Sequence, residues 1–163
     1  MKRAAVIVSA VFFLVIMTTT GFSLFAEPVQ LKGLKTLAVD IRIDQTVVEL
    51  KEADFRTDIE LKLRMAGVRV VPMNGAESRD GTLRIDLIAV EDNAKIMYSY
   101  GIRVDFSQRM VLPSRSDTSI FSTTWSRWMV GLGGKKKAPP VMKETVRAFV
   151  DEFINDYLAA NPK

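Results

Sequence analysis

Two kinds of periodicity divide this chain and limit what it can fold into. Apolar residues first recur at every second position, from Leu37 to Ile43, which is the period of a strand with one buried face. From Glu52 the spacing changes to three or four residues, as in a helix, and Gly67 follows its end. A short apolar run, Val68 to Val71, comes next. This order predicts a crossover unit whose two strands are parallel.

The next two segments predict a hairpin. Apolar and polar residues alternate over 83–90 and again over a longer run, 98–110. Such regular alternation favours antiparallel strands, because strands buried on both faces read as continuous apolar runs. Tyr98 and Tyr100 are in phase with the apolar positions and are expected to pack in the core. If the long run formed a sheet edge, it would offer a place for a partner strand.

A last strand is predicted over 120–130. The spacing of Phe121, Trp125 and Met129 is expected to place them on one face, with Trp125 under the final helix. Trp128 falls on the opposite face and is the better candidate for an exposed contact.

A loop is expected over 131–140, followed by an amphipathic helix. The apolar stripe of that helix comprises Met142, Val146, Phe149, Phe153 and Tyr157. Together these elements predict an α/β fold of the α+β type. It is a two-layer sandwich with a mixed sheet of about five strands and two helices on one face.

The N-terminus predicts export. Lys2 and Arg3 precede an apolar stretch from Ala4 to Met17, and small residues lead to Ala26, as in a signal peptide. Residues 1–26 are therefore assigned as a signal peptide and residues 27–163 as a single domain of the periplasm. The alternative is an uncleaved anchor over residues 4–25 in the inner membrane, because about 20 residues span the hydrocarbon core.

Missing residue types exclude several kinds of chemistry. The chain contains no cysteine, so lipid attachment, disulfides and thiol catalysis are excluded. It contains no histidine, which removes a hydrolase triad and the commonest zinc ligand. The formal charge of +4 includes Lys2 and Arg3, and the remaining charges are mixed along the chain, which argues against nucleic acid as a partner. No catalytic residue, metal site or cofactor is predicted.

Four aspartates are the only candidates for carboxylate chemistry. They are Asp40, Asp44, Asp86 and Asp105, and arginines at 42, 84 and 103 lie two residues from acids on the same strand faces. Cross-strand ion pairs on a solvated sheet explain this pattern most simply. A carboxylate site for catalysis or metal, and an anion site made by the arginines, are the alternatives.

The segment Gly131 to Lys135 resembles a phosphate-binding loop only superficially. Such a loop needs glycine where Met129 stands and serine or threonine where Lys136 stands. Lysines beside tryptophans are instead typical of contacts with a membrane headgroup layer or an anionic polymer. The candidate contact surface is therefore Trp128, Lys135, Lys136 and Lys137, and a plain solvated turn is the alternative.

The last 70 or so residues carry a resemblance. The segment Thr123 to Ser126, the glycines at 131 and 133, and the ending Val150 to Pro162 resemble a family of uncharacterised secreted bacterial proteins, as does the 54–67 helix. This family has no assigned activity and so implies no catalytic residue. At the level of fold alone, the order of elements is similar to the N-terminal domain of the Tol translocation propeller protein and to small envelope assembly lipoproteins.

The function expected from these observations is non-enzymatic binding or assembly in the cell envelope, at a protein partner or the membrane surface. Two alternatives remain. One is a histidine-free enzyme that acts on an envelope glycan through Asp40, Asp86 or Asp105. The other is a lipid or lipopolysaccharide handling protein, which predicts an apolar groove between sheet and helices. Nothing in the sequence indicates an oligomeric state.

Overall fold

The structure is a computed structural model that describes residues 28–44, 50–74, 79–112 and 115–162. The signal segment 1–26 lies outside these residues, so the choice between cleavage and anchoring stays a prediction. The elements, in chain order, are a 3-10 turn η1 (Pro28–Leu31), β1 (Thr36–Ile43), α1 (Glu52–Met65), β2 (Arg69–Val70), β3 (Gly81–Glu91), β4 (Met97–Leu112), β5 (Arg115–Gly134) and α2 (Ala138–Ala160).

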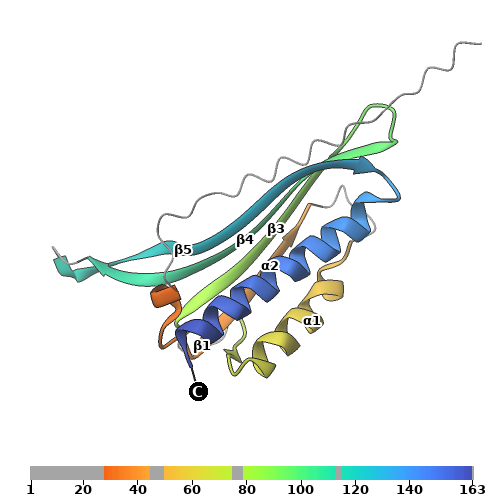
Figure 1. Ribbon diagram of the computed structural model, residues 1–163. Helices are drawn as coiled ribbons and strands as arrows, with labels where there is room; N and C mark the ends of the chain where they lie inside the picture. Colours follow the sequence, from red (N-terminus) through yellow and green to blue (C-terminus); the bar gives the residue numbers. More distant parts are fainter. Residues whose placement is uncertain (1–27, 45–49, 75–78, 113–114, 163) are drawn as a thin grey trace, which may run out of the picture.

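The five strands form one mixed sheet in the order β2-β1-β3-β4-β5. β1 is parallel to β2, as the crossover through α1 predicted, and it is also parallel to β3. β3, β4 and β5 are antiparallel neighbours. Both helices cover the same face, so the predicted two-layer α+β sandwich is confirmed (Figure 1).

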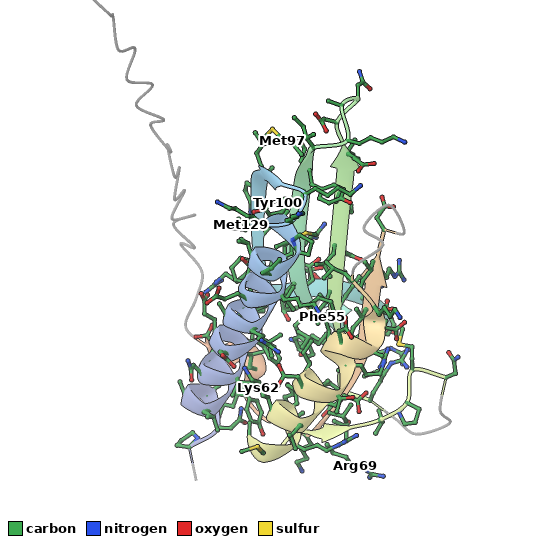
Figure 2. All side chains as sticks on the ribbon, turned by 90° about the vertical axis from the view of Figure 1, so that its right-hand side faces the viewer. Phe55, Lys62, Arg69, Met97, Tyr100 and Met129 are labelled. Atoms are coloured by element: carbon green, nitrogen blue, oxygen red, sulfur yellow. The ribbon has the colours of Figure 1, made fainter. Side chains whose placement is uncertain are left out.

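The core lies between the helices and the covered face of the sheet. α1 contributes Phe55, Ile59 and Leu63, all buried at the period that the sequence predicted. Phe55 and Tyr100, labelled in Figure 2, are both buried. On α2 the buried stripe is Met142, Val146, Val150, Phe153 and Tyr157, while Phe149 is only partly buried beside it.

The junction between β5 and α2 differs from the predicted loop. β5 continues to Gly134 and α2 begins at Ala138, so only Lys135, Lys136 and Lys137 form the turn. Proline is tolerated in the first turn of a helix, where its missing N–H would have no partner. Pro139 and Pro140, predicted as the end of the loop, therefore lie inside α2.

The predicted orientation of Phe121 was wrong, because β5 contains a β-bulge. Phe106 pairs with Trp125 but Ser107 pairs with Thr123, so Thr124 is an extra residue in β5. An extra residue reverses the alternation of side chains on the two sides of the bulge. Trp125 and Met129 face the helices, whereas Phe121 faces the open side, where Arg109 lies over its ring.

The strand positions also correct the idea that the 98–110 run is an edge. β4 lies between β3 and β5, and β5 forms the edge of the sheet instead. The pairing of β3 with β4 stops at Gly81 and Gln108, so residue 109 and those after it pair only with β5. This part of the β4–β5 hairpin extends beyond the helices at the left of Figure 1.

Candidate docking surface on the open face of the sheet

The face of the sheet opposite the helices carries six charged side chains in a regular array. Strand register places Asp40 beside Arg84 and Arg84 beside Asp105, and one row further Arg42 lies beside Asp86 and Asp86 beside Arg103. We call this array the charged band; its members are Asp40, Arg42, Arg84, Asp86, Arg103 and Asp105. Opposite charges alternate both along and across the strands.

Ion pairs hold two of its three carboxylates. The Oδ2 atom of Asp40 lies 3.0 Å from Nη2 of Arg42 and 3.2 Å from Nε of Arg84. Asp105 is buried, with Oδ2 2.6 Å from Nε of Arg103, and its Oδ1 accepts a hydrogen bond of 2.6 Å from Oγ of Ser126. Of the predicted cross-strand ion pairs, Arg84–Asp40 is present, whereas Arg42–Asp40 and Arg103–Asp105 each join two residues of one strand.

The third carboxylate of the charged band, Asp86, has a shifted pKa. Burial raises the pKa of Asp86 above its ordinary value, and the negative charge of Asp105 adds to this, while Arg84 and Arg42 act in the opposite direction. Asp44 lies just past β1, where its backbone N–H donates to the Leu87 carbonyl at 2.8 Å. Among the described residues, no group of three or more acids is placed to hold a metal ion.

The same face becomes apolar toward one end. Register places Ile88 and Val130 on either side of Gly101, and Val90 and Leu132 on either side of Ser99. We call five side chains the apolar patch, with these exposed fractions: Ile88 58%, Val90 64%, Trp128 64%, Val130 71% and Leu132 64%. These large apolar residues stay in solvent because the helices cover only the other face.

The middle of the apolar patch has no side chain. Gly101 lies between Ile88 and Val130, and a Cβ added at Gly101 would meet no atom within 4 Å. A glycine inside a strand allows another molecule to approach the backbone closely. The flanking side chains therefore surround a stretch of accessible β4 backbone.

The predicted contact residues lie at opposite ends of this patch. Trp128 pairs with Arg103 where the charged band meets the apolar patch. The three lysines follow the far end of β5, and the six steps of extended strand from residue 128 to residue 134 span about 20 Å. Trp128 is exposed, as predicted, while Trp125 packs under α2 with its ring centroid 5.2 Å from that of Phe153.

The three lysines differ in their surroundings. Lys135 forms an ion pair with Glu91, and its Nζ lies 5.9 Å from the ring centroid of Tyr98. Lys136 and Lys137 are exposed, and within the described part of the chain neither has an ion pair. Lys95 in the turn between β3 and β4 is similarly exposed. The freely solvated cations at this end are thus Lys95, Lys136 and Lys137.

No protein family model matches the chain, and no curated protein matches it. Three solved structures are similar. Rare lipoprotein B from Shewanella oneidensis has 15% identity and a TM-score of 0.37, with 76% of this chain and 94% of that chain covered. A neuraminyllactose-binding hemagglutinin homolog from Helicobacter pylori has 14% identity and a TM-score of 0.41, with 78% and 87% covered. A minor lipoprotein from Acinetobacter baumannii has 16% identity and a TM-score of 0.34, with 78% and 87% covered. TM-scores this low carry no functional argument, and the likeness to the Tol domain stays a prediction.

Two hollows of the described surface lie away from the apolar patch. One lies beside α1 and β2, between Arg56, Arg64 and Pro72, and the other lies on the outer side of the helices, between Lys62 and Arg147. Neither is the apolar groove between sheet and helices that a lipid carrier predicts, since core side chains fill that space in the described structure. No helix in the described ranges is both long and apolar enough to cross a membrane.

Sequence reasoning did not identify four of the five patch residues as a site. Ile88 and Val90 lie within the alternating 83–90 segment, at the positions between the buried residues, and no function was assigned to them. The signal was present, because an apolar residue on both faces of a half-buried strand departs from regular alternation. Val130 was assigned to the predicted strand and Leu132 to the predicted loop, so the sequence did not indicate that both lie on one face of β5.

Proposed function

We propose that this protein is a non-enzymatic binding module of the cell envelope that docks through the apolar patch. The observation that carries the proposal is the exposure of the five patch side chains on the helix-free face. Soluble proteins rarely leave large contiguous apolar surface in water unless another molecule covers it. Covering one such side chain stabilises a complex by about 1.5–3 kcal/mol before the costs of association.

The compartment follows from the N-terminal segment. Residues 1–26 direct export, and residues 27–163 work in the periplasm as one domain. A chain without cysteine receives no lipid anchor, so the domain is either free after Ala26 or tethered through residues 4–25.

The ion pairs of the open face favour binding over catalysis. A catalytic carboxylate needs access to substrate and a proton-transfer partner. Asp40 and Asp105 instead have close arginine partners, and Asp86 is surrounded by arginines. The acids of the open face therefore form, with the arginines, a charged border to the apolar patch.

Photocrosslinking in living cells tests this proposal. A photoreactive phenylalanine analogue at Val130 is expected to form adducts with an envelope component. The matched control is the same analogue at Leu61, which is 54% exposed on α1, on the other side of the molecule. Adducts from position 130 that are absent at position 61 support the proposal. Equal labelling at both positions, or none at 130, contradicts it.

A further inference from the structure

The β3–β4 turn and the β5–α2 turn lie together at one end of the sheet. The backbone N–H of Lys135 donates to the Ile96 carbonyl at 2.8 Å, and the Lys135 side chain pairs with Glu91. Met97, at the start of β4, marks this end in Figure 2. These contacts hold Lys95 of one turn and Lys136 and Lys137 of the other at the same end of the molecule.

Positive charge exceeds negative charge at this end. Residues 91–97 and 134–138 contain the acids Glu91 and Asp92 together with four lysines. Glu91 is engaged by Lys135, and the Oδ1 atom of Asp92 accepts hydrogen bonds from the backbone N–H groups of Ile96 and Met97 at 2.8 and 2.9 Å. The carboxylates are thus used inside the fold, and the remaining lysines face solvent.

The apolar patch leads directly to these lysines. Leu132 and Val90 flank Ser99 in the row nearest the turns, and Ile96 in the β3–β4 turn is also exposed. At the other end of the patch Trp128 lies beside Arg103. Tryptophan and basic residues around apolar side chains match the interface of a bilayer, where rings sit at the headgroups and cations meet lipid phosphates.

We propose that the apolar patch, with Lys95, Lys136 and Lys137 at its end, binds the surface of an anionic lipid bilayer. This inference rests on the proposed function and names the partner of the same surface. A bilayer fits because the five side chains of the patch stand exposed on the face of neighbouring strands, which is a broad surface for contact. Anionic headgroups complement the unpaired lysines.

Binding to lipid vesicles tests whether the lysines at the end of the patch attract anionic headgroups. The protein purified from the envelope is mixed with vesicles of phosphatidylcholine alone or with added phosphatidylglycerol, and the bound fraction is measured by sedimentation. The double variant K136Q/K137Q is expected to lose about 30-fold in affinity for the anionic vesicles, since each lysine near an anionic surface contributes about 1 kcal/mol. The matched control K32Q/K35Q removes the same charge near the start of β1 and is expected to bind normally. Equal binding by both double variants overturns the proposal.

Fluorescence quenching tests contact by the patch itself. Lipids brominated on their acyl chains are expected to quench Trp128, whereas Trp125 is shielded under α2. The variant W128F should therefore lose the quenching while keeping its fold. Bromine on the acyl chains quenches only at short range, so tethering of the domain by residues 4–25 is not enough to quench Trp128 unless the ring itself reaches the bilayer. Absence of quenching in the unaltered protein overturns the proposal.

The two sets of experiments separate the inference from the proposed function. Crosslinks from position 130 to a protein, without quenching of Trp128 by brominated lipid, would support docking through the apolar patch with a protein as the partner. The same result would refute binding to a lipid bilayer. Absence of both crosslinks and quenching would refute both proposals. Quenching together with crosslinks to lipid supports both.

Discussion

The indole Nε1 of Trp125 donates a hydrogen bond of 2.8 Å to Oδ2 of Asp156, which joins the edge strand β5 to α2. The Trp125 ring also packs edge-on against Phe153, and Arg127 lies 5.0 Å from its centroid. An aromatic ring with a satisfied N–H thus fastens the edge of the sheet under the helix.

We expect Trp125→Ala to reduce the free energy of unfolding by about 3 kcal/mol, because it removes the ring packing and the hydrogen bond. Asp156→Ala should cost only about 1 kcal/mol, since the ring stays in place. Urea unfolding followed by circular dichroism measures both. A loss from Trp125→Ala no larger than that from Asp156→Ala would contradict the packing role.

Two glycines of the sheet should respond oppositely to alanine. A Cβ at Gly81 would lie 2.7 Å from the backbone oxygen of Ser107 and would also meet the Phe106 ring, so Gly81→Ala should destabilise by about 1–3 kcal/mol. Gly101 has open space, and alanine suits a strand better than glycine. Gly101→Ala should therefore be neutral or slightly stabilising in thermal unfolding, and equal losses at both sites would contradict a difference in the space around the two glycines.

The start of β1 should give a pH-dependent contribution to stability. Asp80 Oδ2 accepts hydrogen bonds of 2.8 Å from the backbone N–H groups of Lys35 and Thr36. Partial burial acts to raise the pKa of Asp80, but these hydrogen bonds outweigh it and the pKa is lowered from 3.8.

Because the folded pKa is the lower one, Asp80 stabilises the fold above pH 3.8, and this contribution disappears as the pH falls through the folded value. We expect Asp80→Asn to cost about 1 kcal/mol at pH 7. The difference between the two proteins should narrow as the pH falls below 3.8. Unfolding curves over a pH series measure it, and a constant difference would refute the ionic role.

Polar substitutions in the apolar patch should separate binding from folding. Val130→Thr keeps a β-branched side chain on an exposed strand position, so its unfolding free energy should change by less than about 0.5 kcal/mol. Binding of an apolar fluorescent dye should nevertheless fall. Leu61→Gln on α1 is the control, and an equal fall in dye binding there would mean that the patch is not a distinct apolar surface.

Local patterns predicted most of the secondary structure. The period of two over 37–43 and the buried positions Phe55, Ile59 and Leu63 of α1 agree with the structure because each depends only on neighbouring residues. The predicted end of β5 and the predicted start of α2 were wrong. Gly131 and Pro139 are usual in loops, but glycine is tolerated at a sheet edge and proline in a first helical turn.

The candidate site was only partly predictable. Trp128 was correctly placed on the open face, but its neighbours in the patch were not recognised. Ile88 and Val130 are far apart in the chain and come together only through the pairing of β3, β4 and β5. Strand order depends on contacts between distant segments, which local periodicity does not encode.

The sequence alone determined which segments are strands and helices and which of their side chains are apolar, because hydrogen-bonding geometry makes these local properties. The tertiary structure decided that β4 is internal, that the extra residue Thr124 turns Phe121 to the open face, and that five separate apolar residues form one patch. The internal position of β4 depends on the order of the strands. The orientation of Phe121 and the assembly of the patch depend on register, because a shift of one residue changes which face every side chain occupies.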